Sequence, residues 1–142
     1  MSERSQRTID AALWTLSWVM LLGVVILSLV PLPAFPSTPG FDKLVHALAY
    51  AVLTLSFLFA GVWRPVRGEG RYPMAAFAIL IVAVVVGVTI ELIQDVQSYR
   101  SMDAFDALAD AVGAALGAAL WTTLRRAQEL RASAAQGSGL EL

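Results

Sequence analysis

Three long stretches without Asp, Glu, Lys or Arg dominate this chain of 142 residues: 31 residues in 11–41, 20 in 44–63 and 19 in 72–90. A helix needs about 20 mainly apolar residues to cross a bilayer, because each residue adds about 1.5 Å along its axis. The composition agrees, since 58% of the residues are hydrophobic and 15% are charged, against about 45–50% and about 25% in soluble domains. This excludes a soluble enzyme, a nucleic-acid binder and a disordered chain, and we expect a polytopic membrane protein.

A fourth span is expected to carry acidic residues into the membrane. Its apolar stretch, 111–124, has only 14 residues, so a span of about 20 must begin near Asp103. The sequence therefore predicts an all-α bundle of four transmembrane helices over about 11–30, 43–63, 73–98 and 103–124. These form one domain, 1–126, followed by a flexible tail, 127–142. We expect the first helix to be retained, because its apolar run is longer than that of a signal peptide.

The basic residues predict how the helices are oriented. Eight of the ten lie on the side of the two termini: Arg4, Arg7, Arg64, Arg67, Arg71, Arg125, Arg126 and Arg131. Only Lys43 and Arg100 lie on the other side. Basic residues concentrate on the cytoplasmic side of membrane proteins. Both termini are therefore expected to be cytoplasmic.

Polar residues gather at the opposite, outer end of three predicted helices and the loop between two of them. They are Asp42, Lys43, His46, Tyr50, Glu91, Gln94, Arg100, Asp103, Asp106 and Asp110. Within each helix their spacing of three and four places them on one face. A charge at the centre of a membrane helix costs at least about 2.5–3.5 kcal/mol, so such faces turn away from lipid. We expect the three faces to converge on an acidic funnel that is open to the outer surface.

The same residues carry a family resemblance. Along the chain they read Asp42-Lys43-x-x-His46-x-x-x-Tyr50, Glu91-x-x-Gln94, Arg100-x-x-Asp103-x-x-Asp106 and Gly113-x-x-x-Gly117. In order and spacing this pattern resembles the VanZ-like family of small bacterial membrane proteins, named after a member linked to teicoplanin resistance. One position departs from it, since Asp110 stands where the family usually has Asn. The resemblance implies a multi-pass protein of the bacterial inner membrane, with a role in the cell envelope and a site facing the extracytoplasmic side.

Three functions are compatible with this arrangement. In the first, the funnel binds an envelope lipid, a lipid-linked precursor or an amphiphilic, glycopeptide-type antibiotic and contributes to envelope integrity or resistance. Lys43 and Arg100 would then hold anionic groups, and the carboxylates would hold amine or hydroxyl groups. The alternative is an intramembrane enzyme acting on a lipid headgroup, with His46 as base and Glu91 or Asp106 as its partner. Proton-coupled lipid transport ranks third, because the inner halves of the helices show no acidic or histidine relay.

The candidate residues also have structural interpretations. His46 can hydrogen-bond to Glu91 or to an aspartate of the fourth helix, and Glu91 and Gln94 can hydrogen-bond between helices. Asp103 can cap the fourth helix, as aspartate commonly does. The two basic residues can simply neutralise the acids. The sequence leaves open whether the protein is an enzyme.

The composition of the chain limits which cofactors and partners we expect. The chain has no Cys and one His, so no cofactor is expected, and a divalent metal held by His46 and the carboxylates has little support. The expected partner is a membrane lipid or lipid-linked envelope precursor, with no nucleic acid. Gly87, Gly113 and Gly117 permit close helix packing. Packing within the bundle is favoured over a homodimer, because the last two continue the aspartate stripe.

Overall fold

The computed structural model describes residues 3–30, 40–61, 72–97 and 103–137. Over these ranges the chain forms four helices and no strand: α1 (Glu3–Leu29), α2 (Phe41–Ala60), α3 (Tyr72–Val96) and α4 (Ala104–Gly137). Each helix is long and apolar enough to cross a membrane. The predicted all-α architecture with four spans is confirmed.

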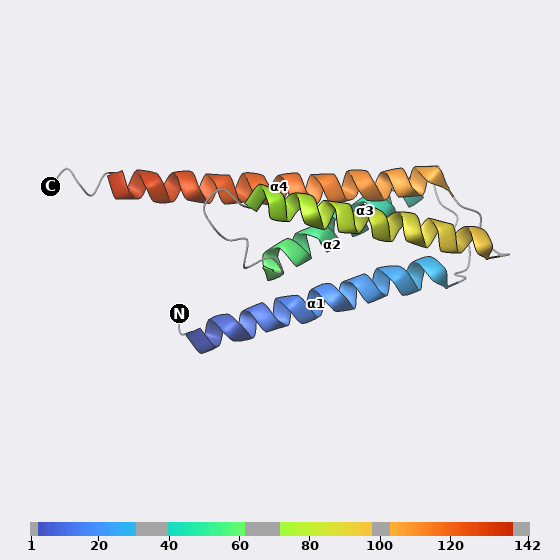
Figure 1. Ribbon diagram of the computed structural model, residues 1–142, viewed down its shortest axis with the longest axis horizontal. Coiled ribbons are helices and arrows are strands. Elements are labelled where there is room, and N and C mark those ends of the chain that lie inside the picture. Colours follow the sequence, from blue (N-terminus) through green and yellow to red (C-terminus); the bar gives the residue numbers. More distant parts are fainter. Residues whose placement is uncertain (1–2, 31–39, 62–71, 98–102, 138–142) are drawn as a thin grey trace.

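The helices run back and forth, so that the two ends of the bundle differ. The N-terminus and the end of α4 lie at one end, and the starts of α2 and α4 meet the ends of α1 and α3 at the other (Figure 1). Helix α4 packs against α2 and α3, with its larger contact on α2, whereas α1 contacts only α2 and α3 among the described helices. The predicted acidic residues therefore share the end away from the termini.

Two glycines define the limits of α2. Gly40 precedes the helix with φ 84° and Gly61 follows it with φ 68°, and the Gly61 N–H donates to the Leu58 carbonyl at 3.3 Å. Positive φ is readily adopted only by glycine, which makes it the usual residue just beyond a helix end. The helix therefore ends at Ala60, three residues before the predicted boundary.

Helix α4 is longer than the sequence led us to expect. A flexible tail was predicted from residue 127, but the helix continues to Gly137. The segment 127–136 is rich in Ala and contains Gln, Glu, Leu and Arg, which are all strong helix formers. Its side chains are exposed, so intrinsic propensity and not packing decides their conformation. The rest of the predicted tail, 138–142, lies outside the described residues.

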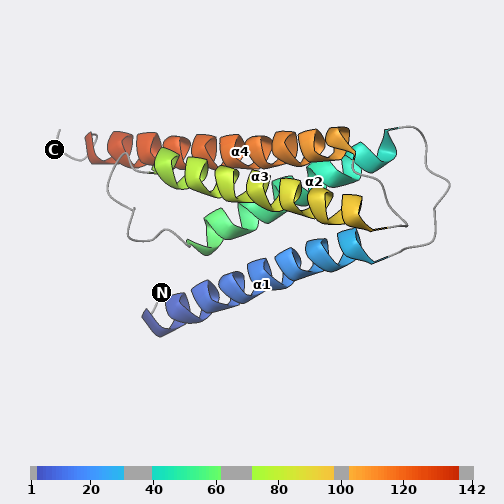
Figure 2. The ribbon, with the colours of Figure 1, turned by 45° about the vertical axis from the view of Figure 1, so that its right-hand side comes forward.

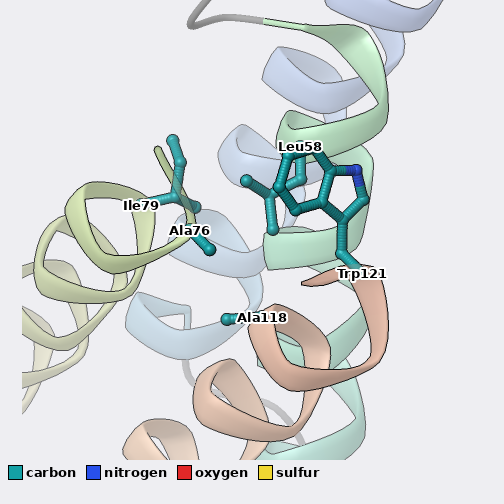
Figure 3. Close-up of a cluster of buried hydrophobic side chains, with 5 residues drawn as sticks. All are labelled: Leu58, Ala76, Ile79, Ala118 and Trp121. Atoms are coloured by element: carbon teal, nitrogen blue, oxygen red, sulfur yellow. The ribbon is translucent and has the colours of Figure 1, made fainter. Parts of the chain in front are cut away.

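The hydrophobic core is thin and built from small residues, and many large apolar side chains face outward. One buried cluster comprises Leu58, Ala76, Ile79, Ala118 and Trp121, drawn from α2, α3 and α4 (Figure 3). A second comprises Tyr50, Ala83 and Ala114. Exposed side chains such as Leu16, Phe77 and Leu116 cover the outside of the helices. This distribution suits a protein surrounded by lipid, where small residues let helix backbones approach one another.

Gly113 and Gly117 fix how α4 lies on α2. A Cβ atom on Gly113 would overlap the backbone carbonyl of Ala47, and one on Gly117 would lie 2.6 Å from the carbonyl oxygen of Ala51. The two backbones are therefore in direct contact over one turn. The GxxxG pair packs inside the chain's own bundle, and this contact sets the height of α2 residues relative to α4 residues.

Candidate functional site

The starts of α2 and α4 meet the end of α3 at one end of the bundle (Figure 2). Nine polar residues lie on or next to these segments. We call them the acidic cluster: Asp42, Lys43, His46, Tyr50, Glu91, Gln94, Asp103, Asp106 and Asp110. The structure places the α2 and α4 members within contact distance of each other across the helix interface. Arg100, the tenth predicted residue, lies outside the described residues.

Lys43 joins α2 to the start of α4. Its Nζ atom donates to Asp106 Oδ1 at 2.6 Å and to Asp42 Oδ2 at 2.8 Å, and it also bonds the Asp103 carboxylate. An ammonium group has three hydrogens to donate, so these three carboxylates can use all of them. Its role here is to neutralise acids, which is the structural interpretation of this residue.

Asp103 caps α4 and ties it to α3. Its Oδ1 atom accepts the N–H of Phe105 at 2.8 Å, and its own N–H donates to Glu91 Oε2 at 2.9 Å. The hydrogen bond from Lys43 holds the pKa of Asp103 below its usual value. The predicted cap is confirmed, and the buried Glu91 carboxylate serves to hold the N-terminus of α4.

His46 lies against two carboxylates that are one turn apart on α4. Its Nδ1 atom is 2.9 Å from Asp110 Oδ1, within hydrogen-bond distance, and its Nε2 atom is 3.8 Å from Asp106 Oδ2. The second separation is too long for a direct hydrogen bond. Among the described residues, Asp106 Oδ2 and His46 Nε2 have no direct hydrogen bond, so each can form one with a further polar group.

Gly87 on α3 makes room for the deepest members of the cluster. A Cβ atom there would lie 2.9 Å from Asp110 Oδ2 and 3.3 Å from the Tyr50 hydroxyl oxygen. Asp110 and Tyr50 therefore approach α3 at the same point. The Tyr50 hydroxyl is buried and has no hydrogen-bond partner within the described part of the chain.

Gln94 connects the cluster to α1. Its Nε2 atom donates to the backbone carbonyl of Ser28 at 2.7 Å. This contact could not be predicted from the sequence, because the acceptor is a main-chain atom and carries no side-chain signature. It attaches the end of α1 to the end of α3.

Exposure falls steadily from the rim of the cluster to its floor. The side chains of Asp42 and Asp103 are 50% and 39% exposed, those of His46 and Asp106 are 17% and 13%, and that of Asp110 is 3%. Tyr50, Glu91 and Gln94 are almost fully buried. A ligand approaching from this end of the bundle meets the carboxylates in that order.

The rim has the donor set of a cation site. One carboxylate oxygen from each of Asp42, Asp103 and Asp106 lies within 4.8 Å of the other two. Oxygen ligands of this kind suit Mg²⁺, Ca²⁺ or Mn²⁺. However, the Lys43 ammonium bonds all three carboxylates, so a divalent cation would have to compete with it. His46 is not part of this group.

Comparison with known proteins identifies the family of this chain. The family model described as VanZ/LLP1 matches residues 3–125, which include α1 to α3, α4 as far as Arg125 and the whole acidic cluster. No curated protein and no solved structure gives a significant match. Because the family model covers most of the chain, this multi-pass membrane protein belongs to the VanZ/LLP1 family.

Proposed function

We propose that the acidic cluster binds the cationic, amine-bearing headgroup of an amphiphile in the membrane. The observation that carries the proposal is an excess of carboxylates on a graded path inward. Five carboxylates, those of Asp42, Glu91, Asp103, Asp106 and Asp110, share the cluster with one lysine and one histidine. Among the described residues of the cluster, carboxyl groups therefore outnumber basic groups, and a cationic ligand suits this set of oxygen acceptors.

The Oδ2 atom of Asp106 provides the binding point. Lys43 uses Oδ1 of Asp106, whereas Oδ2 faces His46 Nε2 across 3.8 Å. An ammonium group placed there would donate to Oδ2, and charge-assisted hydrogen bonds of this kind are about twice as strong as neutral ones. Such a group enters past Asp42 and Asp103, which form the exposed rim. Because Lys43 is already shared among three carboxylates, it is less suited to hold an anion than the sequence suggested.

The surroundings of the cluster favour an amphiphile over a free amine. Exposed apolar side chains flank it on both helices, namely Phe41, Leu44 and Val45 on α2 and Phe105 and Leu108 on α4. A ligand with a hydrocarbon chain can keep that chain in the lipid beside these residues while its headgroup reaches the carboxylates. The distribution of basic residues supports an extracytoplasmic position for this end.

The test is headgroup selectivity at constant chain length. We expect the detergent-solubilised protein to bind dodecylamine more tightly than dodecanol or dodecanoate. Asp106→Asn should weaken amine binding roughly tenfold or more, since a hydrogen bond to a charged group contributes about 1.5–3 kcal/mol. Asp95→Asn is the matched control, because Asp95 is exposed on α3 and the substitution removes the same charge. Equal affinity for the three headgroups would refute the proposal.

Three natural sources can supply such a headgroup: an envelope lipid, a lipid-linked precursor and a glycopeptide-type antibiotic. A contribution to resistance predicts that cells carrying the wild-type protein tolerate more teicoplanin than cells carrying Asp106→Asn, with Asp95→Asn behaving like wild type. If teicoplanin tolerance is unchanged while amine binding is retained, the ligand is an endogenous lipid or precursor. The two can then be separated by mass spectrometry of the lipids that copurify with the protein.

One observation favours a second function. The His46–Asp110 hydrogen bond of 2.9 Å orients the imidazole with its Nε2 atom toward the more exposed part of the cluster. Histidine–carboxylate pairs of this geometry hold a general base in hydrolytic enzymes, so the cluster is also suited to act on a lipid headgroup. His46→Gln separates the two functions, because glutamine keeps hydrogen bonding but cannot serve as a base. Binding predicts that the variant protects cells as the wild type does, and catalysis predicts that protection is lost.

A further inference from the structure

Helix α1 is the least enclosed part of the bundle. Only 6% of its membrane span is buried, compared with 28–33% for the other three helices. Its C-terminal end is attached through the hydrogen bond from Gln94 to Ser28, and its N-terminal end diverges from α4 (Figures 1 and 2). Midway, Trp14 and Trp18 contact Phe57 of α2 edge to face, with ring centroids 6.4 Å and 5.5 Å apart.

This divergence leaves a groove between α1, α2 and α3. The groove encloses about 170 Å³, and ten side chains line it, all of them apolar except that of Thr54. None of its exposed lining surface is polar. On α2, Leu53 of the lining lies three residues, about 4.5 Å, beyond Tyr50, and on α3 Val86 of the lining is next to Gly87. The groove therefore begins directly below the floor of the acidic cluster.

We infer that this groove binds a hydrocarbon chain of a membrane lipid. Water has no polar partners there, and buried water needs two to four of them. Leaving the groove empty would forfeit dispersion contacts along its whole lining. Trp18 and Val82 belong to the lining and are also exposed on the apolar surface of the spans. The groove is therefore continuous with the surface that faces lipid chains.

The shape of the groove favours a narrow occupant, because α1, α2 and α3 all line it and α1 contacts both of the other helices. An extended acyl chain is narrower than a helix because it carries no side chains. Occupation by a lipid chain does not depend on what binds at the acidic cluster.

The inference is tested by photolabelling of the full chain reconstituted in phosphatidylethanolamine and phosphatidylglycerol vesicles. A trace of phosphatidylcholine carries a diazirine in one acyl chain, and mass spectrometry locates the labelled residues. We expect Val86 to be labelled several-fold more than Val85, and Phe57 several-fold more than Ile81. Each comparison residue is exposed on α3 outside the groove and lies at a depth similar to that of its groove residue. Labelling of the groove residues that is equal to or below that of the outer face would overturn the inference.

Two variants with opposite effects keep the test independent of folding. Val86→Trp fills the groove and should reduce labelling of Phe57 several-fold, whereas Val85→Trp adds the same side chain on the lipid face and should leave it unchanged. Phe57→Ala enlarges the groove and should increase labelling of Val86. If Val86→Trp does not fold, the wild-type ratio and the Phe57→Ala variant decide the question. Equal losses in both tryptophan variants, or crosslinks between two protein chains at the groove, would contradict a lipid occupant.

Discussion

The Nδ1 atom of His46 lies 2.9 Å from Oδ1 of Asp110, a carboxylate that is almost completely buried between the helices. For a catalytic pair the sequence pointed to Asp106 or Glu91 as the partner of His46, and for a structural hydrogen bond to Glu91 or any aspartate of the fourth helix. Asp110 takes this position because Gly113, one turn further along α4, touches the backbone of Ala47. That contact places His46, the neighbour of Ala47 in the chain, at the same level as Asp110.

Replacing Asp110 with leucine should destabilise the protein. The variant leaves a partly buried imidazole nitrogen without its partner, which typically costs about 1–3 kcal/mol. Asp110→Asn, which keeps an acceptor oxygen in place, should cost less. Thermal unfolding in detergent measures both, and Asp95→Leu controls for the loss of an exposed carboxylate. If Asp110→Leu proves as stable as the wild type, the hydrogen bond contributes nothing to folding.

Gly113→Ala should separate α4 from α2. The added Cβ would overlap the Ala47 carbonyl, which is backbone and cannot rotate away, and overpacking of this kind typically costs about 1–3 kcal/mol. Gly23→Ala is the matched control, because a Cβ at that α1 position meets no atom within 4 Å. We expect the melting temperature to fall for Gly113→Ala and to stay near the wild-type value for Gly23→Ala. The same fall in both would mean that loss of glycine, and not the clash, is responsible.

Lys43→Gln should create a divalent-cation site. Without the ammonium group, the oxygens of Asp42, Asp103 and Asp106 remain within 4.8 Å of one another and lose the charge that offsets them. A cation that binds only the folded state raises stability by RT ln(1 + [L]/Kd). Adding Mn²⁺ or Ca²⁺ should therefore raise the melting temperature of the variant and leave that of the wild type nearly unchanged. A larger rise in the wild type would show that Lys43 does not occupy the cation position.

The bond between Lys43 and Asp103 should make a pH-dependent contribution to stability. The pKa of Asp103 is lowered in the folded protein, so the folded state favours the ionised carboxylate. The stabilisation is present above the unfolded pKa of about 3.9 and is lost as the pH falls through the lower folded value. The melting-temperature difference between wild type and Asp103→Asn should be small, because solvent screens this exposed residue. The difference in melting temperature should disappear on acidification. A difference that grows toward low pH would contradict this prediction.

Much of the fold could be predicted because it follows from apolar length. A span needs about 20 residues. This alone predicted that the helix containing the short apolar stretch 111–124 begins near Asp103, where α4 starts. The convergence of polar faces also followed from helical spacing, and the structure brings Lys43 and Asp106 to 2.6 Å.

The pairings inside the cluster could not be predicted. They depend on how far α2 is displaced along α4, which is set by a backbone contact at Gly113 and by no property of the polar residues. The attachment of Gln94 to α1 uses a main-chain acceptor, and the extension of α4 beyond residue 124 reflects helix propensity outside the apolar stretch. Hydrophobic patterning carries no signal for either.

Ligand binding at the acidic cluster is tested most directly through the His46 ring. His46 is the only histidine in the chain, so its ring ¹H–¹³C resonances report on the surroundings of Asp106 without ambiguity of assignment. We predict a saturable shift of these resonances when dodecylamine is added to the protein in detergent micelles. Dodecanol should cause little change, and the response to the amine should weaken in Asp106→Asn but not in Asp95→Asn. The same response to the amine and the alcohol, or no response to either, would contradict the binding of a cationic headgroup at this site.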